Sequence, residues 1–131
     1  MNNNPTGRNQ YTIGMSPRRF LRFAAPFGHQ GGPAKDVAKV RALAAVKSRL
    51  PNPTLTIKMN AQGKYQVGLH DGRHRASAAI LKGQKVMLVN ISPSKSLARG
   101  YPGISAKSLV AKVRSSGLLG EYSSGRRVHK L

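Results

Sequence analysis

Two neighbouring segments with alternating side chains most constrain the fold of this chain. In 54–59 and in 65–69 every second residue is apolar, which places those side chains on one face of a β-strand. The four residues Asn60–Gly63 between them have the length of a hairpin turn. We therefore predict two antiparallel strands. Their apolar positions are Leu55, Ile57, Met59, Tyr65, Val67 and Leu69.

The residues that follow predict a helix and a third strand. Asp71 and Gly72 interrupt the strand pattern, and an alanine-rich helix is expected over Arg73–Lys82, ending at Gly83. The expected inner residues of that helix are Ala76, Ala79 and Ile80. The continuous apolar run Val86–Val89 predicts a strand covered on both faces. These elements indicate a compact α+β fold, with helices packed on a small mixed β-sheet.

Three further helices are predicted. Ser16 as N-cap and Pro17 in the first turn begin a short helix, which Pro26 ends. A longer helix is expected over Ala34–Leu50, and a last one over Ser105–Ser116. The apolar stripe of the longer helix consists of Val37, Val40, Leu43, Val46 and Leu50. Loops are predicted for 27–33 and 93–103.

This pattern divides the chain into three parts. Residues 1–11 are expected to be a polar arm, because they are rich in asparagine and show no periodicity. Residues 12–92 form the predicted α+β domain, which is a usual size for one domain. Residues 93–131 are predicted to be a basic C-terminal extension with one helix.

The charge of the chain indicates a polyanionic partner. It has 23 Lys and Arg against 3 Asp and Glu, a formal net charge of +20, shared equally by its two halves. Apolar residues and glycine still make up the usual share for a folded protein. Because each neutralised phosphate releases counterions, we expect nucleic acid, DNA or RNA, bound mainly through its backbone phosphates.

Other classes are excluded by what the sequence lacks. The chain has no Cys, so disulfides, thiolate zinc sites and cysteine nucleophiles are absent. No apolar run approaches the roughly 20 residues of a membrane span, and no signal peptide follows the first Met. We therefore expect no membrane partner and a cytoplasmic or virion-associated protein.

The turn before the alanine-rich helix carries the most chemistry. Arg73, His74 and Arg75 lie in the first turn of that helix, where the helix dipole disfavours cations unless an anion is bound. The free amides of a helix N-terminus suit a phosphate, and Gly72 would let the backbone approach it closely. We predict a phosphate- or nucleotide-binding loop at Gly72, Arg73, His74 and Arg75.

This order of strand, Gly-Arg-His-Arg turn, alanine-rich helix, glycine and apolar strand resembles the ParB/sulfiredoxin superfamily, especially small ParB-like proteins of phages and mobile elements. The resemblance covers about 12–92. It implies a ParB/sulfiredoxin-like fold, and it implies that Gly72, His74 and Arg75 bind a nucleotide or another phosphate group.

The chain departs from the best-known activities of that superfamily at Arg73. Sulfiredoxins have their reactive Cys at this position, so their redox activity is excluded. Chromosome-partitioning members usually have a Glu here that is tied to nucleotide hydrolysis, and they have a helix-turn-helix domain that the residues after 92 are too few to form. The free-serine kinases have an Asp-Gly-His-His-Arg loop, which Asp71–Arg75 approximates. A kinase would also need further acidic residues, and only Asp36 and Glu121 remain.

The residues of this turn also have simpler interpretations. Asp71 could be the N-cap of the helix, and His74 could bond a neighbouring carbonyl. His70 and His74 are four residues apart, but a strand–helix break separates them, so no metal site is predicted. His29 is either an ordinary loop residue or faces the same pocket.

Basic residues outside the turn are candidates for contact with nucleic acid. The alternative interpretation is that they form an ordinary solvent-exposed surface. Phe20 and Phe23 beside them are expected in the core. The candidate nucleic-acid-binding residues are Arg18, Arg19, Arg22, Arg126, Arg127 and Lys130.

Three functions are compatible with these features. The first is a nucleic-acid-binding ParB-like protein. The second is a ParB-like nuclease or a nucleotide-dependent phosphotransferase or hydrolase, with Asp71 and His74 as catalytic residues and a nucleotide with magnesium as cofactor. The third is a non-catalytic component of a phage particle or another nucleoprotein assembly, with other proteins as partners. Only the second requires a cofactor.

Overall fold

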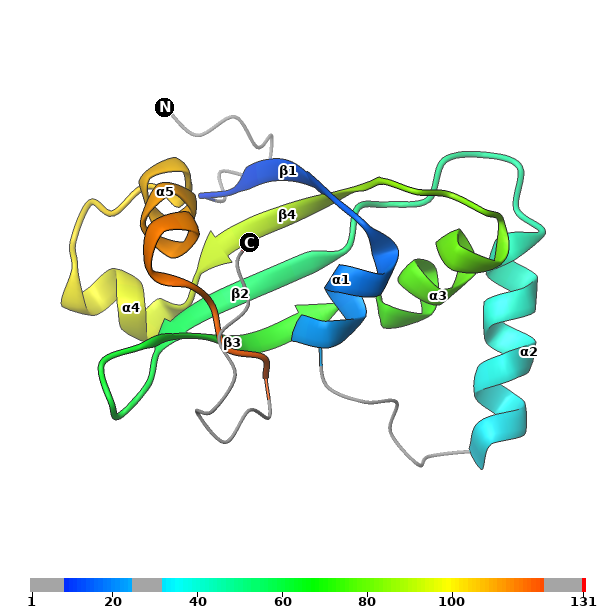
Figure 1. Ribbon diagram of the computed structural model, residues 1–131, viewed down its shortest axis with the longest axis horizontal. Coiled ribbons are helices and arrows are strands. Elements are labelled where there is room, and N and C mark those ends of the chain that lie inside the picture. The colour runs from blue at the N-terminus through cyan, green and yellow to red at the C-terminus, as the bar shows by residue number, and fades with distance from the viewer. Residues whose placement is uncertain (1–8, 25–31, 122–130) are drawn as a thin grey trace.

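The computed structural model describes residues 9–24, 32–121 and 131. Within these ranges the chain is a small α+β fold with a four-stranded mixed sheet and five helices, which confirms the predicted class. α4 and α5 lie near one end of the sheet, and α2 and α3 lie at the other (Figure 1). The elements are β1 (Tyr11–Met15), α1 (Pro17–Phe23), α2 (Gly32–Ala44), β2 (Thr54–Met59), β3 (Tyr65–Asp71), α3 (Arg73–Leu81), β4 (Met87–Pro93), α4 (Lys95–Gly100) and α5 (Ala106–Ser116).

The sheet has the strand order β1-β4-β2-β3. β2 and β3 form the predicted antiparallel hairpin, with Met59 opposite Tyr65 beside the turn. Asn60 stabilises the turn, since its Oδ1 accepts the backbone N–H groups of Gln62 and Lys64 at 3.0 Å each. β4 lies parallel to β2 and antiparallel to β1, which makes the sheet mixed.

β1 is a strand that the sequence analysis did not predict. It lies at an edge of the sheet, and its partner β4 is far along the chain, with Tyr11 opposite Ile91. Ile13 and Met15 are buried, but Gly14 separates them. A five-residue strand with a glycine at its fourth position has a weak local signal, so pairing with β4 decides that it forms.

The core lies on one face of the sheet. Met87, Val89 and Ile91 of β4 are buried there, whereas Leu88 between them is 42% exposed. The prediction that this strand is covered on both faces is therefore wrong. Its alternation of buried and exposed residues is that of a strand covered on one face, and the run of apolar residues concealed this.

Helices supply the other half of the core. Phe20 and Phe23 of α1 are fully buried, as predicted. α3 contributes the small residues Ala76 and Ala79, whereas Ile80, also predicted to face inward, is half-buried. The described part of the segment beyond residue 92 belongs to the same core, through Leu97, Leu109, Val110, Val113 and Leu118.

Several helix ends follow local signals. Ser16 and Ser105 are N-caps of α1 and α5, and each side chain accepts a backbone N–H three residues on at 3.1 Å. Gly83 follows α3 with a φ of +75°, as predicted for the residue after a helix. α4 was not predicted, and it begins inside an expected loop with Ser94 as its N-cap.

α2 ends at Ala44, well before the predicted end at Leu50. Its last turn tightens, because the N–H of Val46 donates to the carbonyl of Leu43 at 3.1 Å. The carbonyl of Val46 then accepts Nζ of Lys82, the C-cap of α3, at 3.2 Å. The carbonyl of Val46 thus bonds a side chain from the end of α3 where a further helical turn would have supplied a backbone N–H, and periodicity alone does not reveal this contact.

Candidate anion-binding site

Gly72 joins β3 to α3 and is tightly packed. It is the N-cap of α3 with a φ of +111°, and no side chain caps the helix. A Cβ at this position would lie 2.7 Å from Cβ of Pro53 and 2.9 Å from its Cα. Only glycine fits here, and Pro53 fills the space on that side of the turn.

Asp71 is not the helix N-cap, so that interpretation is wrong. Its Oδ2 accepts Arg75 Nη2 at 2.8 Å, and the aspartate side chain is 80% exposed. Arg75 is only 15% exposed, and its Nη1 donates to the carbonyls of Pro51 at 2.9 Å and Asn52 at 3.4 Å. Arg75 therefore connects the end of β3, the first turn of α3 and the loop that precedes β2.

The two other basic residues of the predicted phosphate loop are half-buried. Arg73 and His74 lie in the first turn of α3, and both make contacts within the fold. The carboxylates that could assist the candidate catalytic pair Asp71 and His74 are few. Glu121 is bonded to His70, and the side chain of Asp36 lies outside the described residues.

A basic cavity of about 450 Å³ lies beside this turn. Three segments line it: the loop 47–53, one side of α3 with Lys82 just after it, and the start of β4 with Gln84 and Val86 before it. Among the described residues that line it, none is a carboxylate. Its cationic residues are Lys47, Arg49, Arg75 and Lys82. We call this feature the basic cavity.

Neutral groups orient two cations of the basic cavity, Arg49 and Lys82. Arg49 Nη2 donates to Asn52 Oδ1 at 3.1 Å, and Lys82 Nζ donates to the Val46 carbonyl. Asn52 is itself fixed, because its Nδ2 donates to Asn90 Oδ1 of β4 at 3.2 Å. These bonds orient Arg49 and Lys82 without neutralising them, an arrangement that suits an external anion, whereas Arg75 is already paired with Asp71.

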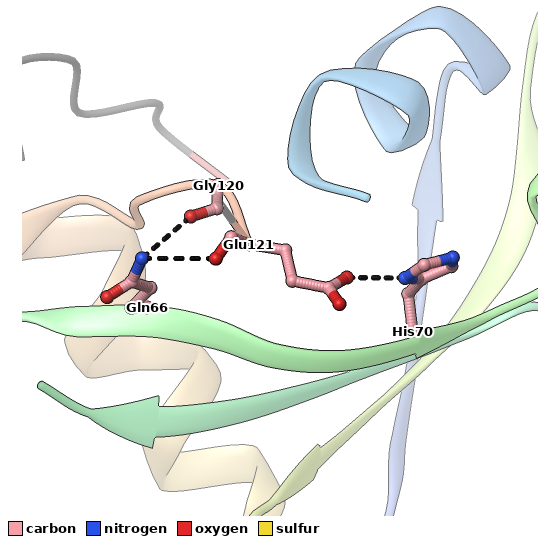
Figure 2. A network of polar contacts seen from close by, with 4 residues as sticks. All are labelled: Gln66, His70, Gly120 and Glu121. Atoms are coloured by element: carbon pink, nitrogen blue, oxygen red, sulfur yellow. Dashed lines mark hydrogen bonds and ion pairs between the residues drawn. The ribbon is translucent and has the colours of Figure 1, made fainter. Parts of the chain in front are cut away.

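A second polar cluster lies on the other side of β3. The ring Nδ1 of His70 bonds to Oε1 of Glu121, and Gln66 Nε2 donates to the carbonyls of Gly120 at 3.0 Å and Glu121 at 3.3 Å (Figure 2). His70 is therefore engaged with a carboxylate of a distant segment. In the parts of the chain that the structure describes, no three His, Cys, Asp or Glu side chains are grouped to hold a metal ion.

The other predicted binding residues are dispersed. Arg18 and Arg22 of α1 are exposed, and Arg19 is half-buried. Within the described ranges, Arg19 Nε has no hydrogen-bond partner. Arg126, Arg127 and Lys130 lie outside the described residues, as does His29.

Sequence reasoning missed three cations of the basic cavity: Lys47, Arg49 and Lys82. The first two lie within the predicted helix 34–50, whereas the structure has them in an exposed loop. The prolines at 51 and 53 indicate that the helix ends before residue 51, but no local sequence signal marks its end at Ala44. Only the folded chain brings these three side chains together with Arg75.

Comparisons with known proteins did not identify a relative of this chain. No protein-family model matches the chain, and the searches of curated proteins and of solved structures found no match. None of the helices in the described ranges has the length and apolar character needed to cross a membrane.

Proposed function

We propose that this protein binds nucleic acid, mainly through backbone phosphates, and that the basic cavity is the centre of its binding surface. The observation that carries the proposal is the charge of the basic cavity, which has four cationic residues and no carboxylate among the described residues that line it. Of the four, Arg75 is paired with Asp71 beside the basic cavity. Phosphate groups are the natural ligands of such a set, because lysine and arginine donate charge-assisted hydrogen bonds to their oxygens.

The charge balance of the chain supports the same function. Only 3 carboxylates stand against 23 Lys and Arg. Two of the three, Asp71 and Glu121, already bond Arg75 and His70. The remaining cations repel one another, and a polyanion that neutralises them lowers this repulsion and releases its own counterions.

The resemblance to the ParB/sulfiredoxin superfamily supports a finer form of the proposal. In that form the fold is ParB/sulfiredoxin-like, and the Gly72–Arg75 turn lies next to a bound phosphate. Arg18, Arg22 and the basic residues near the C-terminus would extend the surface, and the protein would act in the cytoplasm or in a virion.

Titration of labelled DNA and RNA, followed by fluorescence anisotropy at several salt concentrations, tests the proposal. We expect affinity to fall steeply as salt rises. The variant Lys47→Ala/Arg49→Ala removes two exposed cations of the basic cavity. Its affinity should fall about tenfold, and the slope of log K against log salt should become shallower by about 2.

A matched control is Lys107→Ala/Arg114→Ala, which removes one lysine and one arginine from exposed positions of α5. It lowers the net charge equally but leaves the basic cavity intact, so its affinity should change much less. Equal losses in the two variants would contradict a binding surface centred on the basic cavity. Turnover of the nucleic acid or of a nucleoside triphosphate with magnesium, abolished by Asp71→Ala and by His74→Ala, would contradict a purely binding role.

A further inference from the structure

The basic cavity has a size that suits one nucleotide of a nucleic acid. Its volume of about 450 Å³ lies in the range of sites that enclose small molecules. A duplex presents its phosphates on the outside of a stiff rod, and its bases are paired and stacked. A nucleotide of a duplex can enter such a site only after it is flipped out, at a cost of a few kcal/mol. A single strand has no such barrier.

The lining of the basic cavity combines two kinds of surface. The loop 47–53 and α3 provide the cations described above, and the segment that leads into β4 provides aliphatic side chains. A nucleotide has the same two parts, because its phosphate is anionic and its base has an apolar face. The apolar lining residues are Leu50, Pro51, Pro53, Ala79, Val86, Met87 and Leu88.

Two of these aliphatic residues are left exposed by the fold. Val86 is 60% exposed and Leu88 is 42% exposed, and both line the basic cavity. They are two residues apart in an extended segment, so their side chains lie on the same side of it. Exposed aliphatic surface is unfavourable in water, and a flat base laid across it would recover part of that free energy.

We infer that the basic cavity takes one nucleotide of a single-stranded nucleic acid, with the phosphate on the cations and the base against Val86 and Leu88. The inference rests on the proposed function and adds the form of nucleic acid that this site selects. It predicts that the protein binds single strands more tightly than duplexes of the same sequence.

The experiment compares a labelled single-stranded oligonucleotide, its duplex, and a strand of equal length whose sugars lack bases, all at one salt concentration. The single strand should bind about tenfold more tightly than the other two. In the variant Val86→Ser/Leu88→Ser the affinity for the single strand should fall about fivefold, because apolar contact is lost. Its affinity for the duplex and its salt dependence should not change.

A control variant separates the basic cavity from general surface effects. Leu69→Ser/Leu81→Ser removes two other exposed aliphatic residues, and neither lines the basic cavity. It should bind all three ligands as the unmodified protein does. Circular dichroism of both variants checks that the fold is retained.

The failures of the two proposals are distinguishable. Equal affinity for single strand, duplex and base-free strand, reduced in each case by Lys47→Ala/Arg49→Ala, would overturn this inference and leave the proposed function standing. An unchanged affinity in Val86→Ser/Leu88→Ser would overturn it as well. The absence of salt-dependent binding to any of the three would overturn the proposed function and this inference together.

Discussion

The loop 47–53 and the segment 117–121 are both irregular, both lie against regular elements, and both are held by polar groups, yet they differ in exposure. Gly117, Leu118, Leu119 and Gly120 are all buried. In the other segment Lys47, Ser48, Arg49 and Pro51 are all exposed. The difference lies in which groups make the hydrogen bonds.

Backbone hydrogen bonds attach the segment 117–121 to its neighbours, in addition to the side-chain bonds that Gln66 and His70 make to it. The N–H of Leu119 donates to the carbonyl of Tyr65, and the N–H of Val67 donates to the carbonyl of Leu119, both at 3.0 Å. The N–H of Glu121 donates to the carbonyl of Phe23 at 2.8 Å, so the segment joins β3 to the end of α1. The donors and acceptors of these bonds are neutral backbone groups, so the bonds place no charged group at the surface. The segment therefore acts in holding β3 and α1 together.

Cationic side chains hold the loop 47–53. Arg75 donates to the carbonyls of Pro51 and Asn52, and Lys82 to that of Val46 just before the loop. A carbonyl orients a guanidinium or an ammonium group without neutralising it. In both segments backbone carbonyls accept hydrogen bonds. Where the donor is a neutral N–H group the segment becomes part of the core, and where the donor is a cationic side chain the segment becomes part of a charged surface.

The largest expected effect follows from breaking the contact between Gly72 and Pro53. In Gly72→Ala, the new Cβ meets Pro53 at 2.7 Å and the backbone keeps an unfavourable φ of +111°. We expect the free energy of unfolding to fall by about 3 kcal/mol, because the strain and the clash act together. Urea denaturation measures the change.

The control for that variant is Gly83→Ala, at the other end of α3. Gly83 has a φ of +75°, but no atom lies within 4 Å of the added Cβ. Its loss should be about 1 kcal/mol, the cost of the backbone conformation alone. If the two variants lost the same amount, Pro53 would not be packed against Gly72 as described.

A smaller effect is expected from Glu121→Ala in the second cluster. The side chains of His70 and Glu121 are each 12% exposed, so removal of the carboxylate leaves a nearly buried imidazole without this partner. The free energy of unfolding should fall by about 2 kcal/mol. Glu121→Gln keeps an oxygen acceptor and should lose less than half as much in the same denaturation experiment. A loss from glutamine as large as that from alanine would contradict a role for this hydrogen bond.

The smallest effect on stability is expected from Asp71→Ala. Its ion pair with Arg75 is exposed on the aspartate side, and such surface pairs contribute at most about 0.5 kcal/mol. Loss of a negative charge beside the basic cavity should raise the affinity for nucleic acid about twofold. Asp71→Asn should raise it equally, because the charge matters and the hydrogen bond does not. A fall in affinity would show that the carboxylate itself takes part in binding.

The hairpin, α3 with its closing glycine, and α5 with its serine cap were predictable because their signals are local. Alternation over 54–69, Gly83 after an alanine-rich run and Ser105 before an apolar pattern each act over a few residues. β1 was not predictable in the same way, since Gly14 weakens its pattern and its partner strand is distant. For the candidate site, the Gly72–Arg75 turn was predicted from sequence, but the basic cavity beside it was not.

The sequence by itself determined a charge of +20, the hairpin, and a glycine-bounded helix that begins with three basic residues. These follow from composition and from interactions between near neighbours. Only the tertiary structure decided that α2 ends at Ala44, that Leu88 is exposed, and that Lys47 and Arg49 meet Lys82 and Arg75 around one cavity. The physical reason is that Lys82 and Arg75 bond the carbonyls of a segment far from them along the chain, and such long-range bonds leave no periodic trace in the sequence.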